Sequence, residues 1–442
     1  LTGDAAITYT IVGSIAQDYY YITSNYQFDS PAVNIDNPSS DDDRFGWSVA
    51  VSGNYAIVGA YEEDSNLNTN ATGASGSGAV YIYEYENDTW TQKAFVKASN
   101  NTTDTFFGYS VAISGDYAAI GAYREDTTQS LSGAMYIVER NANGDWGIPN
   151  TGNNASIRLT NHMLKATVPG NEDYLGNNVA ISGNYAIAGA YNEDSDGTGA
   201  SNNDKPTSGA AYIFERDANG NWSQKAYLKA NVIDADDFFG GSVAIDGNYA
   251  AVGAQRESSN TINDPNNNDA DKSGAAYIFE RDSNGVWEQK AYLKAAVISA
   301  TGEHYYFGHS VAISGNYFIT GARTTGTGCA YIFERDANGT WSQKQKLLAS
   351  NADDGDFFGW NVSIDGDYAL VGAHKEQSGT TDPDNNDLDN AGAMYLFYRN
   401  NSGVWTETNM FKQDPIVASR FGYNVSVSGP RVIGGAYVVN SN

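Results

Sequence analysis

Short stretches of this chain carry apolar residues at every second position, as in 111–113 and again in 117–120. A period of two is typical of β-strands, because successive side chains of a strand point to opposite faces of its sheet. The two stretches are joined by Ser114-Gly115-Asp116, and glycine supplies the positive φ that a tight hairpin needs. The pattern therefore predicts a two-stranded hairpin.

Two further strands follow in each unit. In one copy the third strand is predicted at 209–216 and the fourth at 222–229, where Trp222 opens the strand. Asn219-Gly220 lies between them and is a strong hairpin signal. Each unit is thus predicted to be a four-stranded antiparallel meander, with a variable loop between its second and third strands.

This unit recurs seven times, so that the predicted domain is a single repeat domain over residues 1–442. Each copy contains the phrase F-G-x-[SN]-V-[AS]-[IV]-[SD]-G, followed about 14 residues after its first position by Gly-Ala. The copies start near Phe45, Phe107, Leu175, Phe239, Phe307, Phe358 and Phe421, and the Gly-Ala pairs start at Gly59, Gly121, Gly189, Gly253, Gly321, Gly372 and Gly435.

The ends of the chain decide between an open stack and a ring. After Phe421 only two strands remain, and the N-terminal stretches 5–12 and 19–28 read as the missing third and fourth strands. A sheet shared by both ends leaves no unpaired terminal blade. We therefore predict an all-β fold, a seven-bladed β-propeller of four-stranded antiparallel blades, whose ring is closed by residues 1–30 completing the C-terminal blade.

Composition narrows the range of partners and protein classes that can be expected. The chain has 25 Lys and Arg against 53 Asp and Glu, a net charge of −28, which repels phosphate backbones and excludes nucleic acid as an expected partner. The single cysteine, Cys329, cannot form an internal disulfide. No apolar run approaches the roughly 18 residues of a membrane span, and no charged-then-apolar leader opens the chain, so we expect a mature or trimmed soluble piece without a transmembrane segment.

The paired Phe-Gly and Gly-Ala phrases resemble the FG-GAP repeats of integrin α-subunit propellers and of secreted bacterial surface proteins. The resemblance implies a secreted or cell-surface recognition or adhesion module, with an extracellular protein or glycan as its partner. One feature departs from it. The family's calcium loop would lie between the first two strands, where this chain has only Ser-Gly-Asn-Tyr, as at 52–55, which is too short to wrap an ion.

Antiparallel order places the short turns on one face of the ring and the long loops on the other. The loop face collects acidic inserts, for example 192–208 and 257–273. Binding sites commonly lie on such loops, so we expect this acidic face to be the contact surface. The alternative is that these loops only keep the protein soluble.

Two inserts share an alternating pattern of oxygen-bearing side chains that suits Ca²⁺. Their candidate ligands are Asp264, Asn266, Asn268 and Asp271 in one loop, and Asp382, Asp384, Asn386 and Asp389 in the other. The central glycine and terminal glutamate of a helix-loop-helix calcium site are absent, and Asx-rich turns also satisfy their own backbone. Calcium at these loops and a purely local hydrogen-bonding role both remain open.

A second candidate site is formed by the residues that follow Phe-Gly and Gly-Ala. In a ring, these positions form circles around the axial mouth, where aromatic rings beside amides and carboxylates suit sugar binding. Blade-to-blade packing is the alternative role. The candidates are Trp47, Tyr61, Tyr109, Tyr123, Tyr191, His309, Trp360, His374, Tyr423 and Tyr437.

No catalytic constellation is evident. The imidazoles are His162, His304, His309 and His374, and no nucleophile elbow or zinc-spaced motif surrounds them. The glutamates after Gly-Ala recur from blade to blade, so we expect them to bind loop amides or to pair with Arg124, Arg256 and Lys375. We predict a non-enzymatic protein, and keep a polysaccharide-binding or polysaccharide-processing role at the axial mouth, or a structural role in an extracellular assembly, as alternatives.

Overall fold

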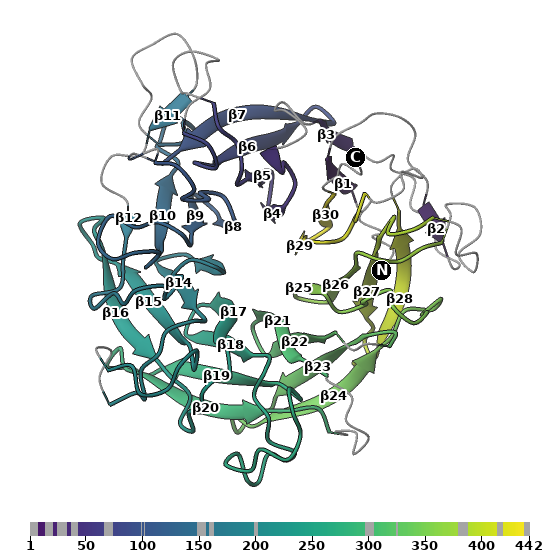
Figure 1. Cartoon of the computed structure of the whole chain (residues 1–442). Coiled ribbons are helices and arrows are strands. Elements are labelled where there is room, and N and C mark those ends of the chain that lie inside the picture. Colours follow the sequence, from purple (N-terminus) through teal and green to yellow (C-terminus); the bar gives the residue numbers. More distant parts are fainter. Residues whose placement is uncertain are drawn as a thin grey trace.

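The computed structural model describes residues 8–13, 21–23, 33–36, 43–65, 74–98, 100, 102–147, 156–158, 163–198, 202–296, 305–323, 326–378, 388–412 and 419–436. These residues form an all-β propeller, in which sheets are arranged around a central opening (Figure 1). Among them, no helix has the length and apolar character needed to cross a membrane.

The first strand of each sheet lies nearest the axis and forms a hairpin with the second. The first strands are β4 (Ser48–Ser52), β8 (Ser110–Ser114), β13 (Val179–Ser182), β17 (Phe239–Asp246), β21 (Phe307–Ser314), β25 (Asn361–Asp365) and β29 (Val425–Ser428). The second strands are β5 (Tyr55–Ala60), β9 (Tyr117–Ala122), β14 (Tyr185–Ala190), β18 (Tyr249–Ala254), β22 (Tyr317–Ala322), β26 (Tyr368–Ala373) and β30 (Arg431–Gly435).

In six sheets a third and a fourth antiparallel strand complete the blade. The third strands are β6 (Ala79–Glu86), β10 (Ala134–Glu139), β15 (Ala210–Arg216), β19 (Ala275–Arg281), β23 (Cys329–Arg335) and β27 (Ala393–Arg399). The fourth strands are β7 (Thr89–Lys97), β12 (Met163–Leu164), β16 (Trp222–Leu228), β20 (Trp287–Leu293), β24 (Trp341–Leu347) and β28 (Trp405–Phe411). The prediction of four-stranded antiparallel blades is confirmed for these six.

The remaining sheet, built from both ends of the chain, corrects the prediction of seven antiparallel blades. Its order is β29-β30-β1-β3, where β1 (Thr8–Gly13) is parallel to β30 and β3 (Val33–Asp36) is parallel to β1. The predicted fourth strand at 19–28 is not there; its residues Tyr21–Thr23 (β2) pair with β28 of the neighbouring blade. Parallel neighbours need a crossover connection rather than a hairpin. The fourth strand of this sheet is therefore β3, which comes later in the chain than the predicted segment.

Two more edge details differ from the pattern of the other blades. Ser156–Arg158 (β11) adds a parallel fifth strand to β7. Trp146 does not open the fourth strand of its blade, which is β12, but forms an isolated bridge with Arg140 and is only 1% exposed. Its indole packs against Tyr55 of the preceding blade at 5.6 Å between ring centroids, so it keeps the packing role of the other strand-opening tryptophans.

Adjacent sheets meet through a glycine that has no room for a side chain. A Cβ placed on Gly253, the glycine of Gly-Ala, would lie 2.0 Å from the carbonyl oxygen of Gly308, the glycine of the next Phe-Gly. All seven copies of the phrase have this contact, at 1.9 to 2.2 Å. They include the last copy, where Gly435 meets Gly46 of the first. The recurrent glycines of the sequence therefore mark the closest approach of neighbouring backbones.

A hydrogen bond at the opposite end of each first strand joins the same two neighbouring sheets. The glycine N–H of each short turn donates to the serine or aspartate that ends the first strand of the adjoining sheet, as from Gly247 to Ser182 Oγ at 3.2 Å. The bond from Gly53 to Ser428 Oγ, at 3.1 Å, joins the first and last copies. The other pairs are Gly115 with Ser52, Gly183 with Ser114, Gly315 with Asp246, Gly366 with Ser314 and Gly429 with Asp365.

Candidate functional site: the aromatic mouth of the propeller

The residue before each Phe-Gly has a left-handed backbone conformation in every copy, although none is a glycine. Their φ values lie between +47° and +60°, a region that residues other than glycine rarely adopt. The residues are Arg44, Phe106, Tyr174, Phe238, Tyr306, Phe357 and Arg420. This turn brings a third ring of side chains to the loop-side mouth, beside the two rings that the sequence predicts, and no sequence signal other than its regular position marks it.

On one side of the mouth the predicted aromatic residues form a continuous contact path. Trp47 packs against Tyr61 at 4.9 Å and against Tyr109 at 5.5 Å between ring centroids. Tyr109 contacts Tyr123 at 4.4 Å, and Tyr123 contacts Tyr174 of the newly identified ring at 5.6 Å. Because these residues come from successive sheets, the contacts also hold the blades together.

The path continues to Tyr191 and Phe238. Tyr191 stacks on Tyr174 at 5.6 Å with an interplanar angle of 27°, and meets Phe238 at 5.3 Å. Burial raises the pKa of the Tyr191 hydroxyl to about 12, so this residue stays neutral near pH 7. Thus the mouth presents uncharged phenol groups that can donate and accept hydrogen bonds.

In the other direction the path reaches the two histidines. Trp47 packs on Tyr423 at 4.6 Å, and Tyr423 on Trp360 at 5.4 Å. Trp360 then contacts His309 at 4.6 Å and His374 at 4.3 Å. Nine of the ten predicted mouth residues therefore lie along one path, and Tyr437 lies outside the described residues.

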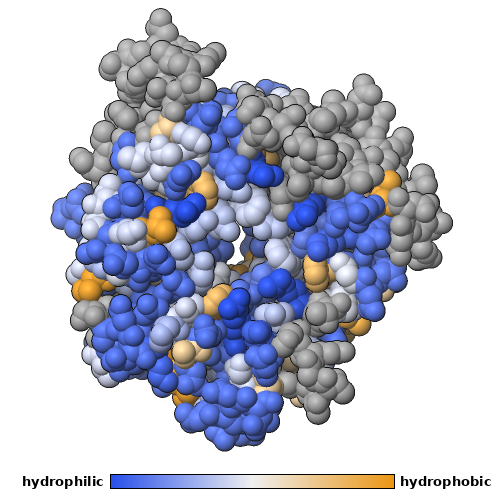
Figure 2. All heavy atoms as spheres, in the orientation of Figure 1, coloured by the Kyte–Doolittle hydropathy of each residue, from blue (hydrophilic) through white to orange (hydrophobic). Residues whose placement is uncertain are grey.

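The path borders an axial cavity of about 620 Å³. Seven of the predicted residues line it: Trp47, Tyr109, Tyr123, Tyr191, His309, Trp360 and Tyr423. Below them the first strands of all seven sheets supply small and aliphatic side chains, such as Val49 and Val311. Figure 2 shows the central opening and a mostly hydrophilic surface around it. A concave, rigid wall with half-exposed rings is the kind of site that binds small ligands.

The basic side chains at the mouth stack on rings rather than pairing with the recurrent glutamates. Arg124 lies 5.0 Å above Phe106, and Arg256 lies 3.7 Å above Phe238. Lys375 lies 4.5 Å above Phe357. The expectation that these three cations would pair with the glutamates after Gly-Ala is therefore wrong, because the left-handed turn places an aromatic face beneath each cation.

Lysines at the ends of the fourth strands, or directly after them, take the partner role instead. The glutamate after Gly-Ala forms an ion pair with a lysine of its own blade in five copies, while a carboxylate oxygen also accepts loop amides, as from Ser259 to Glu257 at 3.0 Å. The expected binding of loop amides is thus confirmed. The pairs are Glu63 with Lys97, Glu125 with Lys165, Glu193 with Lys229, Glu257 with Lys294 and Glu376 with Lys412.

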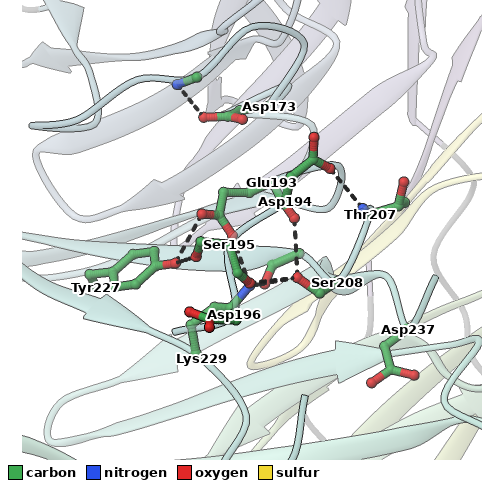
Figure 3. A network of polar contacts seen from close by, with 12 residues as sticks. Asp173, Glu193, Asp194, Ser195, Asp196, Thr207, Ser208, Tyr227, Lys229 and Asp237 are labelled. Carbon is green, nitrogen blue, oxygen red and sulfur yellow. Dashed lines mark hydrogen bonds and ion pairs between the residues drawn. The ribbon is translucent and has the colours of Figure 1, made fainter. Parts of the chain in front are cut away.

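Figure 3 shows one of these clusters in full. Lys229 Nζ donates to Glu193 Oε2 at 2.8 Å and to Ser208 Oγ at 2.8 Å, while the Tyr227 hydroxyl donates to Glu193 Oε1 at 3.0 Å. Every one of these side chains fixes the loop between β14 and β15. Since the arrangement repeats in five blades, we assign it to stabilising the scaffold.

A buried aspartate belongs to several of these clusters. Burial raises the pKa of Asp173 and Asp237 to about 7 and that of Asp356 to about 6. Each carboxylate accepts a loop N–H, which partly offsets the shift, as from Gly170 to Asp173 Oδ2 at 2.6 Å. These aspartates therefore change protonation in the ordinary pH range.

The predicted ligands of the first calcium loop form hydrogen bonds and an ion pair with protein groups. Asp264 Oδ1 accepts the N–H of Asn266 at 3.3 Å, and Asn268 donates to Asp234 at 3.3 Å. Asp271 pairs with Lys272 at 3.7 Å. Within the described ranges, no group of three or more His, Cys, Asp or Glu is placed to hold a metal ion.

The second predicted calcium loop is described only at its end. Asp389 accepts a hydrogen bond from Asn390 Nδ2 at 2.8 Å. Asp382, Asp384 and Asn386 lie outside the described residues. Calcium binding stays a prediction for both loops.

Comparison with known proteins identifies the repeat. A sequence model of the FG-GAP repeat matches residues 36–83, 90–138, 163–214, 222–279, 287–333 and 341–397. The match 222–279 runs from β16 to β19, so that the sequence repeat begins in one blade and ends in the next. No curated protein matches the chain in sequence.

Solved structures show likeness of fold. A protein from Lactobacillus plantarum has a TM-score of 0.51 at 12% identity, over 84% of this chain and 85% of that chain. Pseudomonas aeruginosa periplasmic gluconolactonase reaches 0.47 at 11% identity, over 90% and 92%. Kuenenia stuttgartiensis hydrazine synthase reaches 0.45 at 11% identity, over 81% and 78%. At these values the first comparison supports the fold alone, and the other two carry no argument about activity.

The buried Glu257–Lys294 pair gives a stability test. Lys294→Leu leaves a buried carboxylate unpaired, and we expect it to lower the free energy of unfolding by about 3–5 kcal/mol. The double change Glu257→Thr with Lys294→Leu should recover most of this loss, since the chain itself has Thr325 and Leu348 at these repeat positions. Denaturant unfolding measures both, and a double variant no more stable than the single one would contradict the assignment.

The buried aspartates predict a pH dependence. Their folded-state pKa values lie above the usual 3.8, so the folded protein binds more protons between about pH 4 and 7. Their contribution to stability is therefore fully present at low pH and is lost as pH rises through 6–7. We expect Asp173→Asn, Asp237→Asn and Asp356→Asn together to raise the melting temperature at pH 8 more than at pH 5. An equal effect at both pH values would contradict this.

Proposed function

Since this chain belongs to the FG-GAP repeat family, whose repeats here build a rigid ring of aromatic side chains, we propose that it is a non-enzymatic recognition module that binds a saccharide at its loop-side mouth. The observation that carries the proposal is the unbroken path of rings from His309 to Phe238 beside the axial cavity. We further propose that the protein acts outside the cell or on its surface, as the family resemblance implies.

The mouth has the two chemical properties that sugar binding requires. Ring faces of Trp47, Trp360 and Tyr423 are half-buried, so they offer flat apolar surface to the C–H face of a pyranose while staying accessible. Neutral hydroxyl and amide groups lie beside them, including Tyr191 and Gln255. Contacts between rings from different sheets fix their positions before a ligand arrives, which lowers the entropy lost on binding.

A binding role accounts for the titratable groups better than catalysis does. Burial, together with the positive charges of nearby Arg420 and Lys375, lowers the pKa of His374 to about 3, so this imidazole stays neutral near pH 7. The ring of His309 is hydrogen-bonded to Gln255 Oε1 at 2.6 Å, and burial lowers its pKa as well. Neither histidine has a carboxylate partner among the described residues, and the recurrent glutamates are held by lysines. His162 and His304 lie outside the described part of the chain.

A second candidate function is protein recognition by the acidic loops, which also lie on the loop face. The insert at 194–207 favours it, because the partly exposed Asp196 accepts hydrogen bonds from Thr198 and Asn202, which fix its carboxylate. A carboxylate fixed in this way suits a basic protein surface. Calcium at the loop 264–271 would belong to this second function.

The mouth surrounds the axis fully only if the last sheet meets the first. We propose that the mixed sheet β29-β30-β1-β3 serves as a seventh blade and closes the ring. The support is that Gly435 approaches Gly46, and Gly53 donates to Ser428, in the same way as the other neighbouring copies contact one another. The amide N–H of Val49 also donates to Asn424 Oδ1 at 2.9 Å across this junction.

Loss of a mouth ring tests the saccharide proposal. A glycan array identifies ligands of the unmodified protein, and titration then compares Trp360→Ala with Tyr398→Ala, a control at the opposite end of a third strand, where Tyr398 is 39% exposed. We expect Trp360→Ala to weaken binding at least about tenfold, since a stacked ring contributes on the order of 1 kcal/mol beyond its buried area. The control should bind normally. Absence of any glycan binding, or equal affinity of both variants, would contradict the proposal.

Glycine substitutions test ring closure. We expect Gly435→Ala to destabilise the protein by about 3 kcal/mol, as much as Gly253→Ala, because either added methyl group meets a carbonyl oxygen. Gly241→Ala is the control, since the nearest atom to its Cβ lies at 3.1 Å and other copies carry large side chains there. A mild effect of Gly435→Ala beside a severe effect of Gly253→Ala in thermal unfolding would mean that the ring is open.

A further inference from the structure

One sector of the mouth is rich in positive charge, although the chain has a net charge of −28. Arg256, Arg323 and Lys375 come from three successive sheets. Arg256 lies over Phe238 at one end of the aromatic path, while Arg323 lies over Trp360 and Lys375 over Phe357, close to the histidines at the other end. None of the three forms an ion pair with a carboxylate of the described residues. We call these three residues the cationic sector; the neutral imidazole of His374 lies beside them.

Arg323 lies at the centre of this sector. Its guanidinium lies 4.6 Å from the Tyr306 ring centroid and 5.1 Å from that of Trp360, and its Nε is buried without a hydrogen-bond partner within the described structure. Stacking on two rings fixes the plane of the guanidinium and leaves its N–H groups available at the edge. A planar oxyanion such as a carboxylate can accept two such N–H groups at once.

The groups around Arg323 add to the positive potential. The positive charge of Arg256 lowers the pKa of Arg323. The charge of Arg323 in turn lowers the pKa of both His309 and His374. Among the described residues, no carboxylate is a principal cause of the pKa shifts of Arg323, His309 and His374. His374 Nδ1 is also buried without a partner among the described residues. A bound anion would relieve the repulsion and supply the missing hydrogen bonds.

We propose that the cationic sector binds the carboxylate or sulfate group of an acidic saccharide whose sugar ring stacks on Trp360. This inference rests on the proposed function, and it specifies the class of saccharide. The overall negative charge further selects for a ligand with few anionic groups, because a densely charged polyanion is repelled by the protein before it reaches the mouth. A uronic acid within an otherwise neutral chain has the expected charge pattern.

Matched disaccharides test the inference. The probes are neutral disaccharides of gluco, galacto and manno configuration, the same disaccharides with one uronic acid, and the same with one sulfate group, titrated calorimetrically into the full chain. We expect at least one uronic or sulfated member to bind tenfold or more tightly than its neutral counterpart, with the preference falling as salt is raised. The carboxylate and sulfate arms identify which anion fits.

Three variants separate this inference from the proposed function. Arg323→Gln should abolish the preference for the acidic member while neutral binding persists, and Arg323→Lys should restore only part of it, because lysine keeps the charge without the planar fork. Trp360→Ala should weaken neutral and acidic probes alike. Equal binding of neutral and acidic probes, or an equal loss for both in Arg323→Gln, would overturn the inference alone. Absence of binding by every probe would overturn the saccharide function as well.

Discussion

The propeller depends on one close approach between backbones, where the glycine of Gly-Ala lies against the carbonyl oxygen of the next Phe-Gly. At 1.9 to 2.2 Å from an ideal Cβ position, no side chain can be accommodated at any of these glycines. The short distance lets neighbouring first strands approach the axis together. Their side chains then hydrogen-bond across the junction, as Ser242 Oγ does to Gly308 O at 2.8 Å. Packing between sheets follows from this contact, since the buried residues lie on the two sheet faces that it brings together.

The same contact also positions the candidate site. The residue after Phe-Gly and the residue after Gly-Ala lie within two positions of these glycines, and the contact therefore brings their side chains together at the mouth. Trp47 and Tyr61 illustrate this, since Trp47 follows Phe45-Gly46, Tyr61 follows Gly59-Ala60, and their rings meet at 4.9 Å. The scaffold therefore fixes where these side chains lie, while the residue type at each position is free to set the chemistry. This is why the repeat pattern predicts a fold far better than it predicts a ligand.

The sequence was sufficient to predict the features that depend on a local pattern of residues. Alternation, turn glycines and the repeated phrase predicted the hairpins of six blades and the convergence of the mouth residues. It was insufficient where pairing is non-local. The parallel partners of β1 and the short β12 carry no turn signal, because a crossover and a two-residue strand leave no periodic pattern. The left-handed residue before Phe-Gly was missed because Phe238 or Tyr174 gives no hint of positive φ.

The glutamate–lysine pairs show a signal that sequence comparison within one chain can reveal. Partners such as Glu257 and Lys294 are far apart along the chain, so no short motif contains both. However, the one repeat with Thr325 in place of the glutamate also has Leu348 in place of the lysine. A buried charge is costly without its partner, so both are kept or both are absent. Lysines at these sites are therefore committed to the scaffold, which leaves the arginines that stack on mouth rings as the cations with freedom to meet a ligand.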